Sequence, residues 1–62
     1  MQYVINTEKG YIRDIFGLTA RFQNAKAAES YVVANLEQDV KVYEITSIHG
    51  EVVKTIRNSF PF

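Results

Sequence analysis

The chain has 62 residues, no cysteine and one histidine, and its seven lysines and arginines balance seven aspartates and glutamates. A chain this short is predicted to form one domain, residues 1–62, which buries only about 60% of the surface that its unfolded form exposes. Disulfides and a zinc site are excluded, so oligomerisation or unusually good packing must compensate for the small core. The neutral charge argues against a protein whose main task is to bind polyanions.

The start of the chain predicts a β-hairpin. Tyr3-Val4-Ile5 is rich in β-branched and aromatic residues, and residues 6–10 (NTEKG) are turn formers. Residues 11–16 (YIRDIF) predict the second strand, after a loop of about four or five residues. In the connection that follows, Leu18 and Phe22 are expected to pack under the edge of the sheet.

One helix is predicted from about Ala25 to Glu37. Asn24 is a favourable N-cap, because its side-chain carbonyl can accept a hydrogen bond from an amide of the first helical turn. Apolar residues then recur at spacings of three and four, which gives a stripe suited to lying across a sheet. The stripe consists of Ala25, Ala28, Val32 and Leu36, with Tyr31 beside them.

Two more strands are predicted, from Val40 to Ile48 and from Glu51 to Arg57, joined by a turn at His49-Gly50. A two-residue turn, with glycine at a position that needs positive φ, fixes the register of this hairpin. The resulting pairs are Ser47 with Val52, Ile45 with Lys54, and Tyr43 with Ile56. The predicted core face comprises Tyr43, Ile45, Val52 and Ile56. A glycine bulge would shift the register by one residue, so both registers stay open.

Together these elements predict an α+β domain of order β-β-α-β-β, with one helix packed on a four-stranded antiparallel sheet. A short aromatic tail, residues 58–62, ends the chain, with Phe60 and Phe62 on either side of Pro61. Proline favours an extended shape here, so the two rings are presented on a semi-rigid arm. We expect them either to cap the domain's own core or to dock on a second subunit or a partner.

No group of residues predicts catalysis. His49 lies in a predicted turn, where an exposed side chain without a catalytic role is expected. The glycines at positions 10, 17 and 50 lie too far apart for a phosphate-binding loop. A chain this short also has little material for a pocket in which carboxylates could converge. We therefore predict that the protein is not an enzyme and uses no cofactor or metal.

The main functional indication is a surplus of apolar side chains over what one small core can bury. Six residues are expected to form a surface for a partner or for self-association: Tyr3, Tyr11, Tyr43, Val53, Phe60 and Phe62. This surface predicts a non-enzymatic protein–protein interaction module and a homo-oligomer, with a dimer favoured.

Two alternative functions stay open. The first is nucleic-acid binding through Arg13, Arg21 and Lys26, with Tyr11 as a stacking surface. Against it, acidic residues neighbour most of the basic ones in the sequence, a mixture that is more typical of a solvated surface. The second alternative is a sponge that traps a small molecule or a nucleotide between subunits.

Three segments of the chain resemble small proteins encoded in bacteriophage and prophage genomes. These segments are residues 3–5 (YVI) with 10–12 (GYI), residues 22–31 (FQNAKAAESY), and residues 43–45 (YEI) with 50–53 (GEVV). The resemblance implies a bacterial cytoplasm and an inhibitor or adaptor that blocks or redirects a host protein, and it carries over no functional residue. The chain also begins without a charged leader and an apolar core, and no apolar run approaches ~18 residues, so a cytoplasmic protein without a membrane partner is expected.

Overall fold

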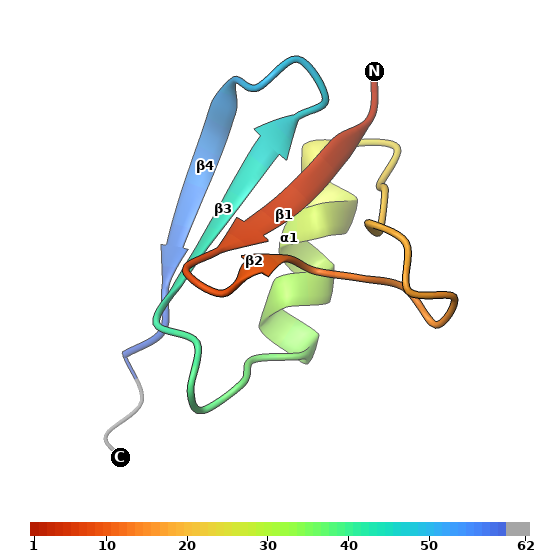
Figure 1. The fold of residues 1–62 in the computed structure, drawn as a ribbon. Coiled ribbons are helices and arrows are strands. Elements are labelled where there is room, and N and C mark those ends of the chain that lie inside the picture. The colour runs from red at the N-terminus through yellow and green to blue at the C-terminus, as the bar shows by residue number, and fades with distance from the viewer. Residues whose placement is uncertain (60–62) are drawn as a thin grey trace.

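A four-stranded antiparallel sheet with one helix across one of its faces forms the architecture of the computed structural model (Figure 1). The structure describes residues 1–59, so the expectations for Phe60 and Phe62 lie outside the described residues. The elements are β1 (Tyr3–Thr7), β2 (Gly10–Tyr11), α1 (Ala25–Ala34), β3 (Val42–Ser47) and β4 (Val52–Arg57). The strand order in the sheet is β2-β1-β3-β4, which confirms the predicted α+β fold.

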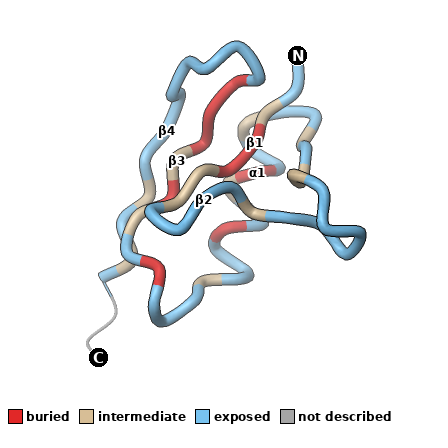
Figure 2. Tube along the Cα trace, viewed as in Figure 1, coloured by how far each residue is buried: buried red, intermediate tan, exposed pale blue. Residues whose placement is uncertain are grey.

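The centre of the sheet is the pairing of β1 with β3, which runs from Tyr3 opposite Ser47 to Thr7 opposite Tyr43. Side chains on the face towards α1 form the core, because alternate residues of each strand point to that face. The buried cluster consists of Ile5, Ala28, Val32, Val40, Tyr43 and Ile45. Figure 2 shows this burial concentrated on β1, β3 and the inner side of α1.

The predicted N-cap of the helix is confirmed, since the side-chain oxygen of Asn24 accepts the N–H of Ala27 at 2.8 Å. The helix ends at Ala34, before the predicted Glu37. Asn35 explains the earlier end: its backbone N–H donates to Val32 O at 3.1 Å and its side-chain amide donates to the carbonyl of Tyr31 at 2.9 Å. These bonds satisfy carbonyls of the last turn, so a further helical turn is not needed.

The β3–β4 hairpin follows the predicted register over part of its length. Tyr43 lies opposite Ile56 and Ile45 lies opposite Lys54, as predicted. Between Ile45 and Thr46 a bulge shifts the register, so that Thr46 and not Ser47 lies opposite Val52. The prediction of Val52 as a core residue is therefore wrong, because pairing with Thr46 turns it from the helix and leaves it 49% exposed.

The first hairpin is shorter than predicted. Strand β2 has two residues, and only Glu8 and Lys9 separate it from β1. The predicted strand over residues 11–16 is wrong beyond its start, because the chain leaves the sheet after Ile12. This departure creates the most exposed apolar segment among the described residues.

Candidate functional site

Between Ile12 and Phe22 the chain makes an excursion from the edge of the sheet (Figure 1). We call residues 13–21 the projecting loop. Its ends are fixed to β1: Ile12 N–H donates to Ile5 O at 2.9 Å, and Phe22 N–H donates to Tyr3 O at 2.8 Å. The loop therefore rises from a base that belongs to the rigid sheet.

Hydrogen bonds inside the projecting loop fix its backbone. Asp14 N–H donates to Leu18 O at 2.7 Å, and Gly17 N–H donates to Asp14 O at 3.0 Å. One carboxylate oxygen of Asp14 accepts the N–H groups of Phe16 at 2.8 Å and of Leu18 at 3.0 Å. Arg13 donates from Nη1 to Gly17 O at 2.7 Å. Gly17 has φ +81°, a conformation that glycine adopts without steric cost.

Three large apolar side chains occupy the end of this ordered loop, and we call them the apolar tip. Ile15 is 93% exposed, Phe16 is 80% exposed and Leu18 is 65% exposed. The prediction that Leu18 packs under the sheet is therefore wrong, because the bonds to Asp14 hold Leu18 in the outward turn. The same prediction is right for Phe22, which packs against the core with its ring centroid 5.3 Å from that of Tyr31.

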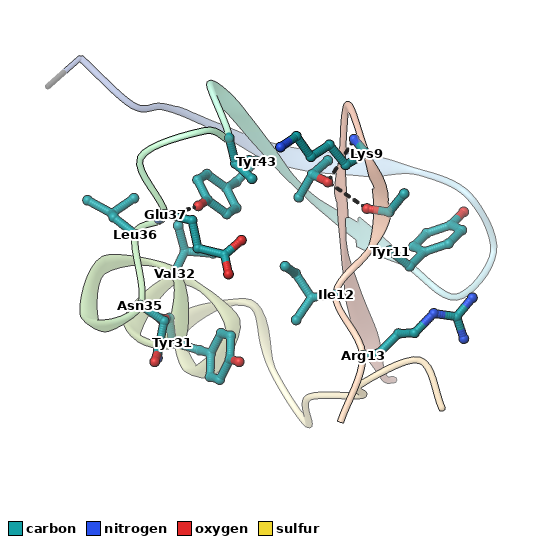
Figure 3. Close-up of a pocket in the computed structure, with 13 residues that line it drawn as sticks. Lys9, Tyr11, Ile12, Arg13, Tyr31, Val32, Asn35, Leu36, Glu37 and Tyr43 are labelled. Carbon is teal, nitrogen blue, oxygen red and sulfur yellow. Dashed lines mark hydrogen bonds between the residues drawn. The ribbon is translucent and has the colours of Figure 1, made fainter. Parts of the chain in front are cut away.

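A hollow of about 630 Å³ lies between α1 and residues 9–13, the segment that runs through β2 into the projecting loop. Figure 3 shows Ile12 facing Val32 and Tyr43 across it, while the side chains of Tyr11 and Arg13 extend away from the helix. A neighbouring hollow of about 460 Å³ includes Tyr31, Arg13 and Ile15 of the tip. The surface beside the apolar tip is thus concave and rests on the hydrophobic core.

Two of the charged groups near these hollows pair with each other. Lys9 forms an exposed ion pair with Asp39, which raises the pKa of Lys9 and lowers the pKa of Asp39. Among residues 1–59, no group of three histidines, cysteines, aspartates or glutamates is placed to hold a metal ion. The predicted turn residue His49 is exposed. The hollows therefore offer contact area beside the projecting loop.

The residues predicted for the interaction surface do not form one surface. Tyr11 is 51% exposed on β2 and Val53 is 43% exposed on β4, at opposite edges of the sheet. Tyr3 is half-buried and packs against the core. The prediction for Tyr43 is wrong, because this residue is only 1% exposed. Its ring packs in the core between the sheet and the helix, and its hydroxyl accepts the N–H of Glu37 at 2.8 Å.

The residues predicted to contact nucleic acid are only partly brought together. Arg13 and Arg21 both lie in the projecting loop, where Arg13 bonds to a loop carbonyl and Arg21 Nη1 lies 3.4 Å from Gln2 Oε1. Lys26 is exposed on α1. Both arginines thus make contacts within the chain, and Lys26 lies on a different element of the fold.

Sequence reasoning missed the apolar tip. The available signal was Asp14 followed three residues later by Gly17, which is the preferred spacing for the ends of a type I turn. An i to i+3 hydrogen bond closes this turn in the structure.

Within residues 1–59, no helix is long and apolar enough to cross a membrane. Comparisons of the chain with protein-family models, with curated proteins and with solved structures found no match.

Proposed function

We propose that the protein is a non-enzymatic protein–protein interaction module that docks its apolar tip into an apolar depression of a partner protein. One observation carries the proposal: Ile15, Phe16 and Leu18 are 93%, 80% and 65% exposed on a backbone that is already hydrogen-bonded. Exposed apolar clusters commonly mark interaction sites, and a few residues buried at the centre of an interface dominate its binding energy.

Burial of the apolar tip can supply a substantial part of a binding free energy. Complete burial of a large apolar side chain stabilises a complex by about 1.5–3 kcal/mol. Association itself costs at least ~4 kcal/mol, to which the ordering of mobile segments would add. Because the bonds to Asp14 already order the projecting loop, less conformational entropy is lost on docking. The hollow beside Tyr31 offers further contact area for a partner.

The role that follows is that of an inhibitor or adaptor, which acts by covering another protein's surface. The resemblance to phage-encoded proteins favours a bacterial host protein as the target and the bacterial cytoplasm as the compartment. The proposal does not depend on this resemblance, since the projecting loop alone supports it. Self-association of the chain, with a dimer favoured, is part of the same proposal, because a partner surface can also be a second copy.

The test compares three immobilised proteins: the wild type, the triple variant Ile15→Ser, Phe16→Ser, Leu18→Ser, and the control Val33→Ser. Val33 is 63% exposed on α1, so its replacement removes exposed apolar area at another place. Circular dichroism first establishes that all three are folded. We expect bacterial lysate proteins that bind the wild type and the control to be lost from the triple variant.

Two outcomes would overturn the proposal. One is that the triple variant retains the same proteins as the wild type, so that the apolar tip contributes nothing. The other is that the wild type sediments with lipid vesicles and the triple variant does not, while no protein binds. In that case the tip inserts into membranes.

A further inference from the structure

The two edges of the sheet are treated differently by the chain. The outer edge of β1 is covered by β2, by Ile12 and by Phe22, each through backbone hydrogen bonds or bridges. The other edge is β4, which has no neighbouring strand on its outer side in the described part of the chain. Figures 1 and 2 show β4 at the border of the molecule and exposed over most of its length.

Backbone groups of β4 that point away from β3 can be assigned from the alternation of an antiparallel pair. The backbone N–H of Val42 points towards β1 and donates to Glu8. Because backbone groups alternate along a strand, the N–H and C=O of the next residue, Tyr43, point towards β4. The backbone N–H of Asn58, just after β4, donates to Lys41 O. On this side of the hairpin, every second residue back from Asn58 therefore points its backbone groups towards β3. Lys54 and Ile56 therefore bond to β3. Thr55 and Arg57 direct their N–H and C=O groups outward.

The usual protection of an edge strand is weak here. Lysines and bulges normally prevent a second chain from pairing with an edge. Lys54, however, is bound to α1, with Nζ 2.8 Å from a carboxylate oxygen of Glu29. The register shift lies beyond Ile45 and Lys54, so the segment from Lys54 to Arg57 pairs regularly with β3. This regular segment can accept another strand.

We propose that a second copy of this chain pairs antiparallel along β4, with the two-fold axis between the two Ile56 residues. Thr55 of each copy then lies opposite Arg57 of the other, and these pairs form about four backbone hydrogen bonds. A register shifted by two residues in one direction would place Arg57 of one copy opposite Arg57 of the other, and repulsion between the like charges disfavours that register. The opposite shift places the bulged Val53 in a hydrogen-bonding position.

This dimer deepens the proposed self-association but rests on a different observation from the apolar tip. It joins the two sheets at β4 and leaves both β2 edges, with their projecting loops, at the far ends. Each dimer therefore presents two apolar tips. A partner that carries two binding sites is bound more tightly by such a bivalent protein than by a monomer.

Cysteine cross-linking tests the register directly, because the chain has no cysteine of its own. Facing residues of a pair without mutual hydrogen bonds lie ~4.5 Å apart between Cα atoms, within the range for a disulfide. We expect Ile56→Cys to form a covalent dimer on mild oxidation. The matched control Val33→Cys, exposed on α1, should stay mainly monomeric at the same concentration. Equal cross-linking of the two variants would overturn the proposal.

Sedimentation of the cysteine-free chain provides the second measurement. The wild type is expected to sediment with twice the monomer mass, and Thr55→Pro, which removes an outward N–H, is expected to be monomeric while folded. A monomeric wild type at the highest soluble concentration would overturn the dimer. So would a dimer that the triple tip variant abolishes and that Thr55→Pro leaves intact. If the tip variant loses its lysate partners but still dimerises, the tip and the β4 edge act independently.

Discussion

The carboxylate of Glu8 accepts a hydrogen bond from the backbone N–H of Val42 at 3.0 Å. The same oxygen accepts the N–H of Lys41 at 2.8 Å. Glu8 thus links the β1–β2 turn to the start of β3, at a point distant in the sequence. The bond from Val42, followed by that from Lys41, lowers the pKa of Glu8 below its ordinary value of 4.5.

Acid should weaken the fold through this link. Because the pKa of Glu8 is lower in the folded state, its contribution to stability is present above the ordinary pKa of 4.5 and is lost as the pH falls through the folded-state pKa. Glu8→Gln should therefore melt at a lower temperature near neutral pH and show a flatter decline below about pH 4.5. Thermal melts of this variant, of the wild type and of the exposed control Glu51→Gln measure the effect. Identical pH profiles for the wild type and Glu8→Gln would contradict it.

The hydroxyl of Tyr43 should contribute measurably to stability. Tyr43→Phe removes the acceptor at 2.8 Å from the N–H of Glu37 and leaves this donor without its partner. The expected loss in the free energy of unfolding is about 1–2 kcal/mol. Urea denaturation measures it, with Tyr11→Phe on the exposed β2 as control, for which a change within ~0.5 kcal/mol is expected. Equal effects of the two variants would show that the buried hydroxyl makes no special contribution.

The helix approaches the sheet closely at Ala28, which is completely buried. Ala28→Leu should reduce the free energy of unfolding by about 1–3 kcal/mol, because extra carbon atoms must displace the packed helix. Ala27→Leu, one residue earlier on the exposed side of α1, should change it by less than ~0.5 kcal/mol. Urea denaturation of both variants gives the comparison. A stable Ala28→Leu variant would mean that the interface holds unfilled space.

The order of the projecting loop should depend on the side chain of Asp14. Asp14→Ala removes the acceptor for the N–H groups of Phe16 and Leu18, so their hydrogen exchange should accelerate by about three- to tenfold. The melting temperature should change little, since the loop lies outside the core. Asp14→Asn keeps an acceptor oxygen and should have a smaller effect. NMR measures the amide hydrogen-exchange rates of the variants and the wild type. Unchanged rates in Asp14→Ala would show that the backbone bonds alone fix the loop.

Local patterns predicted the elements that local chemistry determines. Asn24 caps the helix through its own side chain, and the spacing of apolar residues placed Ala28 and Val32 in the core. The pairing of Tyr43 with Ile56 followed from the turn residues of the second hairpin. The bulge beside Thr46 was left open, because turn chemistry alone does not decide between two registers.

The apolar tip shows why the apolar character of a segment alone does not predict whether it is buried. Ile15, Phe16 and Leu18 have the composition of buried strand residues, and the general preference of such side chains for the interior predicts the opposite of their exposure. Their position depends on two side-chain bonds of Asp14 and on the anchoring of Ile12 to β1. These are contacts of the folded chain, which composition and periodicity do not encode.

The anchoring of the projecting loop also allows the loop to change during evolution without changes in the sheet and helix. Its ends bond to Tyr3 and Ile5, which are neighbours on the same side of β1 and ~7 Å apart. So short a gap can be bridged by loops of many lengths and sequences. The sheet and helix can therefore serve as a constant scaffold on which residues 13–21 change in length and sequence, while the residues that hold the fold together remain unchanged.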